Sequence, residues 1–205
     1  MEFVTSIDAL EALYGKPGEA SLVKVARRMT PLYREWIAAS KLCILSTVGP
    51  EGTDGSPRGD EGPVVRELDP QTLVMPDWRG NNRMDSLRNI VADGRISLMF
   101  MVPGSNNVVR VNGTARLSVE PELLQSFVRK EGLPRSVIVM TIGEIYTQCA
   151  RALMRSGTWS GVDESVELPS VGDILREMTQ GQFDGDAYDA EWMGRAKKTM
   201  WGASD

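Results

Sequence analysis

The alternation of apolar and polar positions predicts a strand-rich middle enclosed by helical ends. Residues 107–119 give the clearest strand pattern, because Val109 and Val111 point one way while Arg110 and Asn112 point the other. Residues 42–48 form a continuous apolar run that suits a buried strand. Strand patterns are expected at residues 42–48, 63–68, 72–75, 95–102, 107–119 and 136–147.

Helical spacing and capping residues mark the two ends of the chain and several connections between strands. Ser6 is expected to cap a helix over residues 7–14, and Pro31 to start another that runs to residue 39. Ser170 and Asp173 form a capping-box pattern before an amphipathic stretch that ends near residue 178. Further helical segments are expected at residues 22–29, 83–92, 121–128, 149–155 and 184–201.

The order of elements is helices, then six strands joined by short connections, then helices. This order lacks alternating βαβ units, so it predicts an α+β fold with a six-stranded antiparallel barrel and flanking helices. No linker divides the chain. We therefore expect one domain over residues 1–205, with N-terminal helices over 1–40, a barrel core over 41–160 and C-terminal helices over 161–205.

Residues 75–90 combine a strand end, a polar loop and a helix start. Pro76 is expected to stop the hydrogen-bond ladder, because proline lacks a backbone donor. Asn82 is a suitable N-cap, and Arg83 places a cation beside the free N–H groups of the first helical turn. Such a helix start suits an anion, above all a phosphate. A capped surface helix with a solvated arginine explains the same spacing, which does not choose between the two.

Composition and charge restrict the possible classes of protein. The chain has 205 residues, 41% of them hydrophobic and 25% charged, which is ordinary for a globular protein with one good core. A net charge of −5 argues against a protein that coats nucleic acid. No apolar run is long enough to span a bilayer, and residues 1–13 lack the basic start of a signal peptide. We therefore expect a cytoplasmic protein.

The sequence contains no histidine. This absence removes most Ser-His-Asp, Cys-His and histidine–metal schemes from consideration. Cys43 and Cys149 have neither a metal-ligand nor a redox spacing, and no metal site is predicted. Chemistry must come from a cofactor or from carboxylate, lysine, tyrosine or cysteine side chains, and the pattern assigns no catalytic residue.

Several polar motifs in and after the predicted barrel occur in a characteristic order. They lie at residues 56–60, 72–77, 80–90, 110–113 and 149–159. Together they resemble the pyridoxamine 5′-phosphate oxidase-like flavoproteins, and more narrowly an FMN-binding subgroup of mostly uncharacterised bacterial proteins. The resemblance spans about residues 40–160, which is the predicted barrel.

The resemblance implies a split β-barrel that binds FMN noncovalently at the interface of a homodimer. The positions that match the phosphate-binding triplet of the founding oxidase are Asn81, Asn82 and Arg83. Arg58, or with less support Arg66, matches the phosphate-binding arginine of the preceding strand. The remaining implied positions are Pro76 and Asp77, where a strand end runs past the flavin ring, and Arg110, which often comes from the other subunit.

The chain also departs from the founding oxidase. The paired arginine and histidine of its C-terminal substrate motif are absent, and Gln148 stands where subgroup members often carry histidine. Pyridoxamine phosphate oxidase activity itself is therefore not expected. Arg155 and Trp159 are the candidates for contacting substrate, although a cation that satisfies helix carbonyls and a packing tryptophan explain them equally well.

Three functional classes follow. The first is an FMN-dependent oxidoreductase acting on a small molecule, with NAD(P)H or dioxygen as the other reactant. The second is a non-catalytic flavin-binding carrier or redox sensor. The third is a related barrel that uses the deazaflavin F420 or haem, and haem is disfavoured because no histidine ligand exists.

Overall fold

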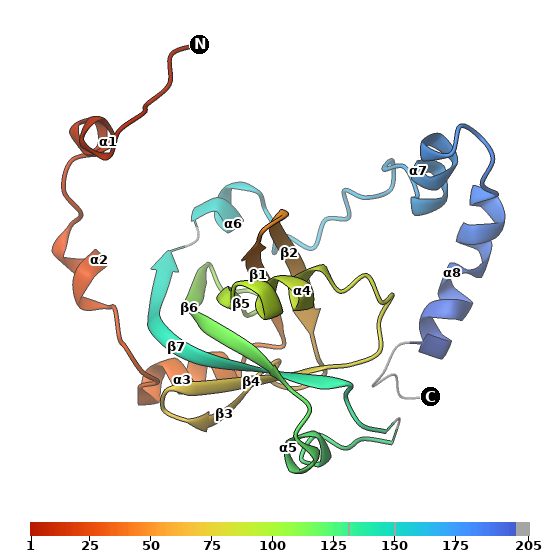
Figure 1. The fold of residues 1–205 in the computed structure, drawn as a ribbon. Helices are drawn as coiled ribbons and strands as arrows, with labels where there is room; N and C mark the ends of the chain where they lie inside the picture. Colours follow the sequence, from red (N-terminus) through yellow and green to blue (C-terminus); the bar gives the residue numbers. More distant parts are fainter. Residues whose placement is uncertain (131, 150, 200–205) are drawn as a thin grey trace.

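The computed structural model describes residues 1–130, 132–149 and 151–199, and omits the side chains of residues 197–199. These residues form an α+β fold in which one antiparallel sheet is flanked by helices (Figure 1). The strands are β1 (Leu42–Gly49), β2 (Gly52–Gly59), β3 (Arg66–Asp69), β4 (Thr72–Asp77), β5 (Arg95–Met101), β6 (Asn107–Ser118) and β7 (Ser136–Cys149). Their order in the sheet is β2-β1-β5-β6-β7-β4-β3.

The sheet has seven strands, so the prediction of six was wrong. The strand that the sequence pattern missed is β2, because none of the expected strands covers Gly52–Gly59. Its glycines and Pro57 are poor strand formers, but β1 pairs with β2 along its whole length. The ladder runs from the pair of Leu42 with Gly59 to the pair of Gly49 with Gly52. β2 also lies at the sheet edge, where proline is tolerated because one side of the strand needs no partner.

The sheet is strongly curled. β2 is the first strand and β4 the sixth, yet Arg58 Nη1 on β2 lies 2.6 Å from Asp77 Oδ1 on β4. Within the described ranges no ladder joins β2 to β3, so hydrogen bonding does not close the curled sheet into a barrel. The ion pair therefore spans the opening between the two ends of the sheet.

The core occupies the inner face of this curl. Alternate residues of β1, β5 and β6 point into it, and Leu45, Phe100 and Val109 are completely buried. The predicted alternation of β6 is confirmed for Val109 and Val111, with a register shift between Asn112 and Gly113. Burial of such side chains supplies most of the driving force for folding.

β4 extends further than expected. Pro76 pairs with Val137 of β7 and the strand continues to Asp77, so the prediction that Pro76 ends the ladder was wrong. The reason lies in the other neighbour, because β3 pairs with β4 only as far as Val74. Beyond that point one side of β4 is free of a neighbouring strand, and the missing N–H of proline removes no ladder bond there.

The helices are α1 (Ile7–Tyr14), α2 (Glu19–Val23), α3 (Pro31–Ala38), α4 (Asp85–Ala92), α5 (Pro121–Gln125), α6 (Arg151–Arg155), α7 (Val171–Met178) and α8 (Gly185–Thr199). The expected caps Ser6 and Ser170 each accept a backbone hydrogen bond at the helix start, and Thr30 does the same before α3. The prediction of a helix over 22–29 was wrong, because α2 ends at Val23 and Ala26 bridges Ile145 instead. The part of the predicted last helix beyond residue 199 lies outside the described residues.

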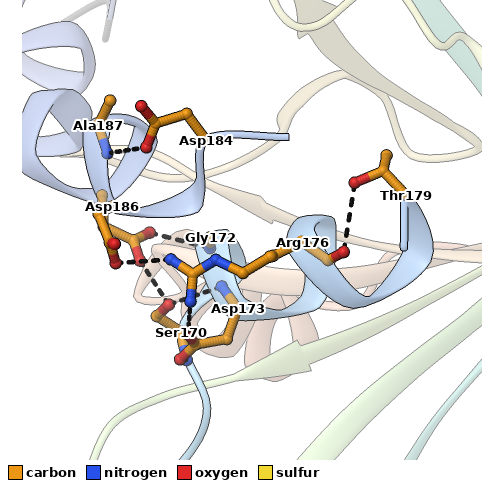
Figure 2. A network of polar contacts seen from close by, with 9 residues as sticks. Ser170, Gly172, Asp173, Arg176, Thr179, Asp184, Asp186 and Ala187 are labelled. Atoms are coloured by element: carbon orange, nitrogen blue, oxygen red, sulfur yellow. Dashed lines mark hydrogen bonds and ion pairs between the residues drawn. The ribbon is translucent and has the colours of Figure 1, made fainter. Parts of the chain in front are cut away.

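The terminal helices stand away from the curled sheet. In Figure 1, α1 and α2 lie on one side of the sheet and α7 and α8 on the other. α7 and α8 form a hairpin held by polar contacts, including Arg176 Nη2 with Asp186 Oδ1 at 2.6 Å (Figure 2). Among the described residues, no helix has both the length and the apolar character needed to cross a membrane.

Candidate functional site

A groove of about 630 Å³ lies at the opening of the curled sheet. Its walls are β2, the end of β4 with the loop that follows, the first turn of α4, and Arg135 with Ser136 at the start of β7. This volume falls within the range of small-molecule sites. Segments that are distant in sequence therefore meet around one space.

Arg58 and Asp77 form the inner wall of the groove. Arg58 pairs with Cys43 in the ladder, so its side chain points to the same inner face, where it is 25% exposed. Its Nη1 donates to Asp77 Oδ1, while its buried Nε has no hydrogen-bond partner within the described chain. An orphaned buried donor is rare and costly, so it is suited to a ligand acceptor.

Cys43 lies beneath this ion pair and is completely buried. Burial raises the pKa of its thiol to about 12, and the charge of Arg58 opposes that rise only in part. The thiol therefore stays protonated at neutral pH and is inert as a nucleophile.

The loop between β4 and α4 has an unusual backbone. Asn82 and Met84 both adopt left-handed conformations, with φ of 62° and 63°. Asn82 was predicted to cap the helix, but α4 begins at Asp85 and its N-cap position is Met84, which makes no side-chain cap. The prediction failed because the Asn82 side chain instead accepts a 2.7 Å hydrogen bond from Arg135. Left-handed non-glycine residues tend to cluster at ligand sites.

Arg83 is positioned at the groove but already has a partner. Its guanidinium binds the Asp85 carboxylate, and 79% of the side chain is exposed. The hydrogen bond to Asp85, and then the charge of Asp85, raise the pKa of Arg83 above its usual value. Asn81 Oδ1 accepts from the Arg83 backbone N–H at 3.0 Å. Asn81, Asn82 and Arg83 thus form one polar turn at the groove.

Trp78 and Arg129 support the far wall. Trp78 is buried and lines the groove, and the Arg129 guanidinium lies 5.1 Å from its ring centroid. Arg129 Nη2 also contacts both carboxylate oxygens of Asp60, at 2.8 and 3.0 Å. Trp78 is therefore a buried apolar part of the groove wall, and the Arg129 guanidinium that packs against its ring is itself held by Asp60.

Arg79 and Arg135 also line the groove, and sequence reasoning missed both. No motif points to Arg135, because it reaches the site only through the pairing of Ser136 with Asp77. Arg79 lies within residues 75–90, two positions before the matched triplet. Its charge in an otherwise acidic chain was the available signal.

The other predicted site residues lie elsewhere in the single chain. Arg110 pairs with Met99 and Tyr146 and contacts Gln148 Oε1 at 3.4 Å. Arg155 is exposed at the end of α6, and Trp159 Nε1 donates to Ser105 O at 2.9 Å. None of the three lines the groove. Their roles stay predictions that require a second chain. Arg66, the alternative to Arg58, binds Ser126 away from the groove.

Comparison with solved structures gives distant similarities. A structure of HupZ from Group A Streptococcus is 19% identical, covers 60% of this chain and 95% of its own, and has a TM-score of 0.49. An FMN-binding protein from Syntrophomonas wolfei subsp. wolfei is 16% identical, with 57% and 88% covered and a TM-score of 0.41. General Stress Protein 26 from Bacillus anthracis is 15% identical, with 56% and 88% covered and a TM-score of 0.42.

No curated protein matches the chain. The family model described as pyridoxamine 5′-phosphate oxidase matches residues 29–149, which is more than half of the sequence. The match begins just before α3 and ends with β7, so it contains every strand of the sheet. The chain therefore belongs to the pyridoxamine 5′-phosphate oxidase-like family.

Proposed function

We propose that this chain is an FMN-binding flavoprotein that works as an FMN-dependent oxidoreductase on a small molecule. One observation carries the proposal: six of the seven residues predicted to bind the cofactor line a single groove. They are Arg58, Pro76, Asp77, Asn81, Asn82 and Arg83. Family membership supports the same conclusion.

The groove suits the cofactor chemically. The family resemblance implies that Arg58 and Arg83 contact the FMN phosphate, and the orphaned Arg58 Nε is a donor without a protein acceptor within the described chain. Pro76, Asp77 and Trp78 form a wall along which the flavin ring would lie. Bound FMN would supply the electron-transfer chemistry, so the chain has only to bind, orient and shield it.

A homodimer with a split barrel in each subunit completes the proposal. Arg110, Arg155 and Trp159 would then reach the groove of the partner subunit, where Arg155 and Trp159 contact substrate. Exposed apolar side chains on α1 and α2, such as Leu13 and Val23, support association, because neither helix has a buried residue. We propose that residues 1–205 act as one domain in this assembly.

A non-catalytic carrier or redox sensor is the alternative, and the groove offers one observation in its favour. Three of its carboxylates, Asp60, Asp77 and Asp85, are each ion-paired with an arginine. The fourth, Asp54, accepts a hydrogen bond from Ser86. None of the four is left as an unengaged general base. An F420-dependent reductase would use the same phosphate contacts.

The test is a visible spectrum of the purified protein before and after incubation with FMN. Flavin bands at about 370 and 450 nm are expected for a bound flavin. Protein that stays colourless and does not retain FMN on gel filtration contradicts the proposal, and retention of F420 in its place selects the deazaflavin alternative. NADH or NADPH is then added under anaerobic conditions to separate an oxidoreductase from a carrier. Reduction of the flavin bleaches its bands and supports an oxidoreductase, whereas unchanged bands support a carrier.

A further inference from the structure

Some charged side chains that line the groove are ion-paired and others are not. Four arginines and four aspartates line it. Arg58 is ion-paired with Asp77 and Arg83 with Asp85, while Asp60 is ion-paired with Arg129. In the part of the chain that the structure describes, the two remaining lining arginines, Arg79 and Arg135, make no ion pair.

An arginine that already holds a carboxylate attracts an incoming anion less than an uncommitted one. An anion placed beside Arg83 also meets the negative charge of Asp85, and the two contributions largely cancel. Breaking the ion pair to free the guanidinium costs part of the binding energy. The net positive field of the groove therefore comes mainly from Arg79 and Arg135.

Arg135 is fixed at both ends by neutral groups. Its backbone N–H donates to Asp77 O at 2.9 Å, and its Nη1 donates to Asn82 Oδ1 at 2.7 Å. The guanidinium has five N–H donors and keeps its full charge, because Asn82 carries none. Arg135 is thus preorganised against the same loop that was matched to the phosphate-binding triplet.

We propose that Arg135, assisted by Arg79, is the principal anion-binding arginine of this groove, and that the anion is a phosphate monoester. Two uncommitted guanidinium groups match the charge of a phosphate dianion. The inference rests on the proposed function where that phosphate is the terminal group of FMN. It assigns Arg83 a secondary part, in which it holds the loop through Asp85.

The experiment compares FMN with riboflavin, which lacks only the phosphate. Dissociation constants are measured by flavin fluorescence for wild type, Arg135→Gln, Arg83→Gln and Arg88→Gln. Arg88 is a matched control, because it is an exposed arginine of α4 that does not line the groove. Loss of a charge-assisted bond predicts that Arg135→Gln weakens FMN about tenfold or more. Riboflavin affinity stays unchanged in every variant.

Arg83→Gln is expected to weaken FMN less than Arg135→Gln, and Arg88→Gln to change neither ligand. If Arg135→Gln keeps the wild-type ratio of FMN to riboflavin affinity, the inference is overturned. It is equally overturned if Arg83→Gln loses more FMN affinity than Arg135→Gln. Circular dichroism of each variant checks that the fold is retained.

A separate measurement distinguishes this inference from the proposed function. If wild type binds neither flavin, the proposed function fails, but inorganic phosphate still probes the arginines. Calorimetric titration with phosphate at constant ionic strength is then expected to give heat with wild type and Arg88→Gln and little with Arg135→Gln. Wild type that binds no phosphate, or Arg135→Gln that binds it as tightly, overturns the inference.

Discussion

The curled sheet and the α7–α8 hairpin are held together in opposite ways. The sheet encloses an apolar interior in which Leu45, Phe100 and Val109 have no exposed surface. The hairpin turns apolar side chains such as Ile174 and Trp192 outward and joins its helices through polar groups. One region is stabilised by burial and the other by a small set of directional contacts.

The contact between α7 and α8 depends on two glycines and one carboxylate. A Cβ on Gly172 would lie 2.2 Å from Gly185 O, so only hydrogen fits there. Asp189 accepts from Gly172 N at 2.9 Å and also binds the Ser170 hydroxyl. Figure 2 shows Ser170, Gly172 and Arg176 gathered at this junction.

This difference indicates two stability units in the chain. The sheet and α4 share one continuous core, which the family match also covers. The hairpin adds no residue to that core, so its opening need not disturb the groove. Elements with few buried apolar contacts open at lower free energy than core strands. The next three predictions test this separation.

The largest effect is expected from Phe100→Ala in β5. Phe100 is completely buried, and removing its ring costs the transfer free energy and leaves a cavity, about 3–5 kcal/mol in total. Urea unfolding followed by tryptophan fluorescence measures the loss. Met99→Ala is the matched control, because the neighbouring side chain lies on the opposite, half-buried face and should cost clearly less. Equal losses at the two positions would argue against a single inner core.

Sequence patterns predicted the parts of the fold that are determined by residues close together in the sequence. The apolar run of β1, the alternation of β6 and the capping box of Ser170 and Asp173 each depend on neighbours in sequence. β2 could not be predicted in this way, because Gly55 and Pro57 are held in a strand only by pairing with β1. Its stability comes from tertiary contacts that override propensity.

The candidate site likewise contains residues that local motifs predicted and residues that depend on distant contacts. Five predicted residues come from motifs that are close together in sequence, and all five line one groove: Pro76, Asp77, Asn81, Asn82 and Arg83. Arg135 was missed because its partner Asn82 is 53 positions away. The error about Asn82 has the same cause, since its carboxamide binds Arg135 in place of capping α4. Which arginine is neutralised depends on three-dimensional neighbours and cannot be derived from spacing.

Gly172→Ala is expected to separate α7 from α8 while leaving the sheet unchanged. The added methyl group collides with Gly185 O and Asp189, and such overpacking costs about 1–3 kcal/mol within the hairpin. Hydrogen exchange should then accelerate in Val171–Met178, with the urea midpoint of the sheet unaffected. Gly194→Ala in α8 is the control, because nothing lies within 4 Å of its added Cβ and alanine favours helix. A lower urea midpoint in Gly172→Ala would show that the two regions are one unit.

The smallest effect is a pH dependence at the start of α7 in the hairpin. The hydrogen bond from the Ser170 backbone N–H, followed by its side-chain contact, lowers the pKa of Asp173 below its usual value. A carboxylate with a lowered folded pKa stabilises the structure above its unfolded pKa and loses that contribution as the pH falls through the folded pKa.

Amide chemical shifts of α7 should therefore change below about pH 3.8, the usual carboxyl value. Asp173→Asn is the matched control, because the amide keeps the shape of the carboxylate but does not titrate, and it should reduce this change in the first turn of α7. An unchanged transition in Asp173→Asn would contradict the assignment to the capping box.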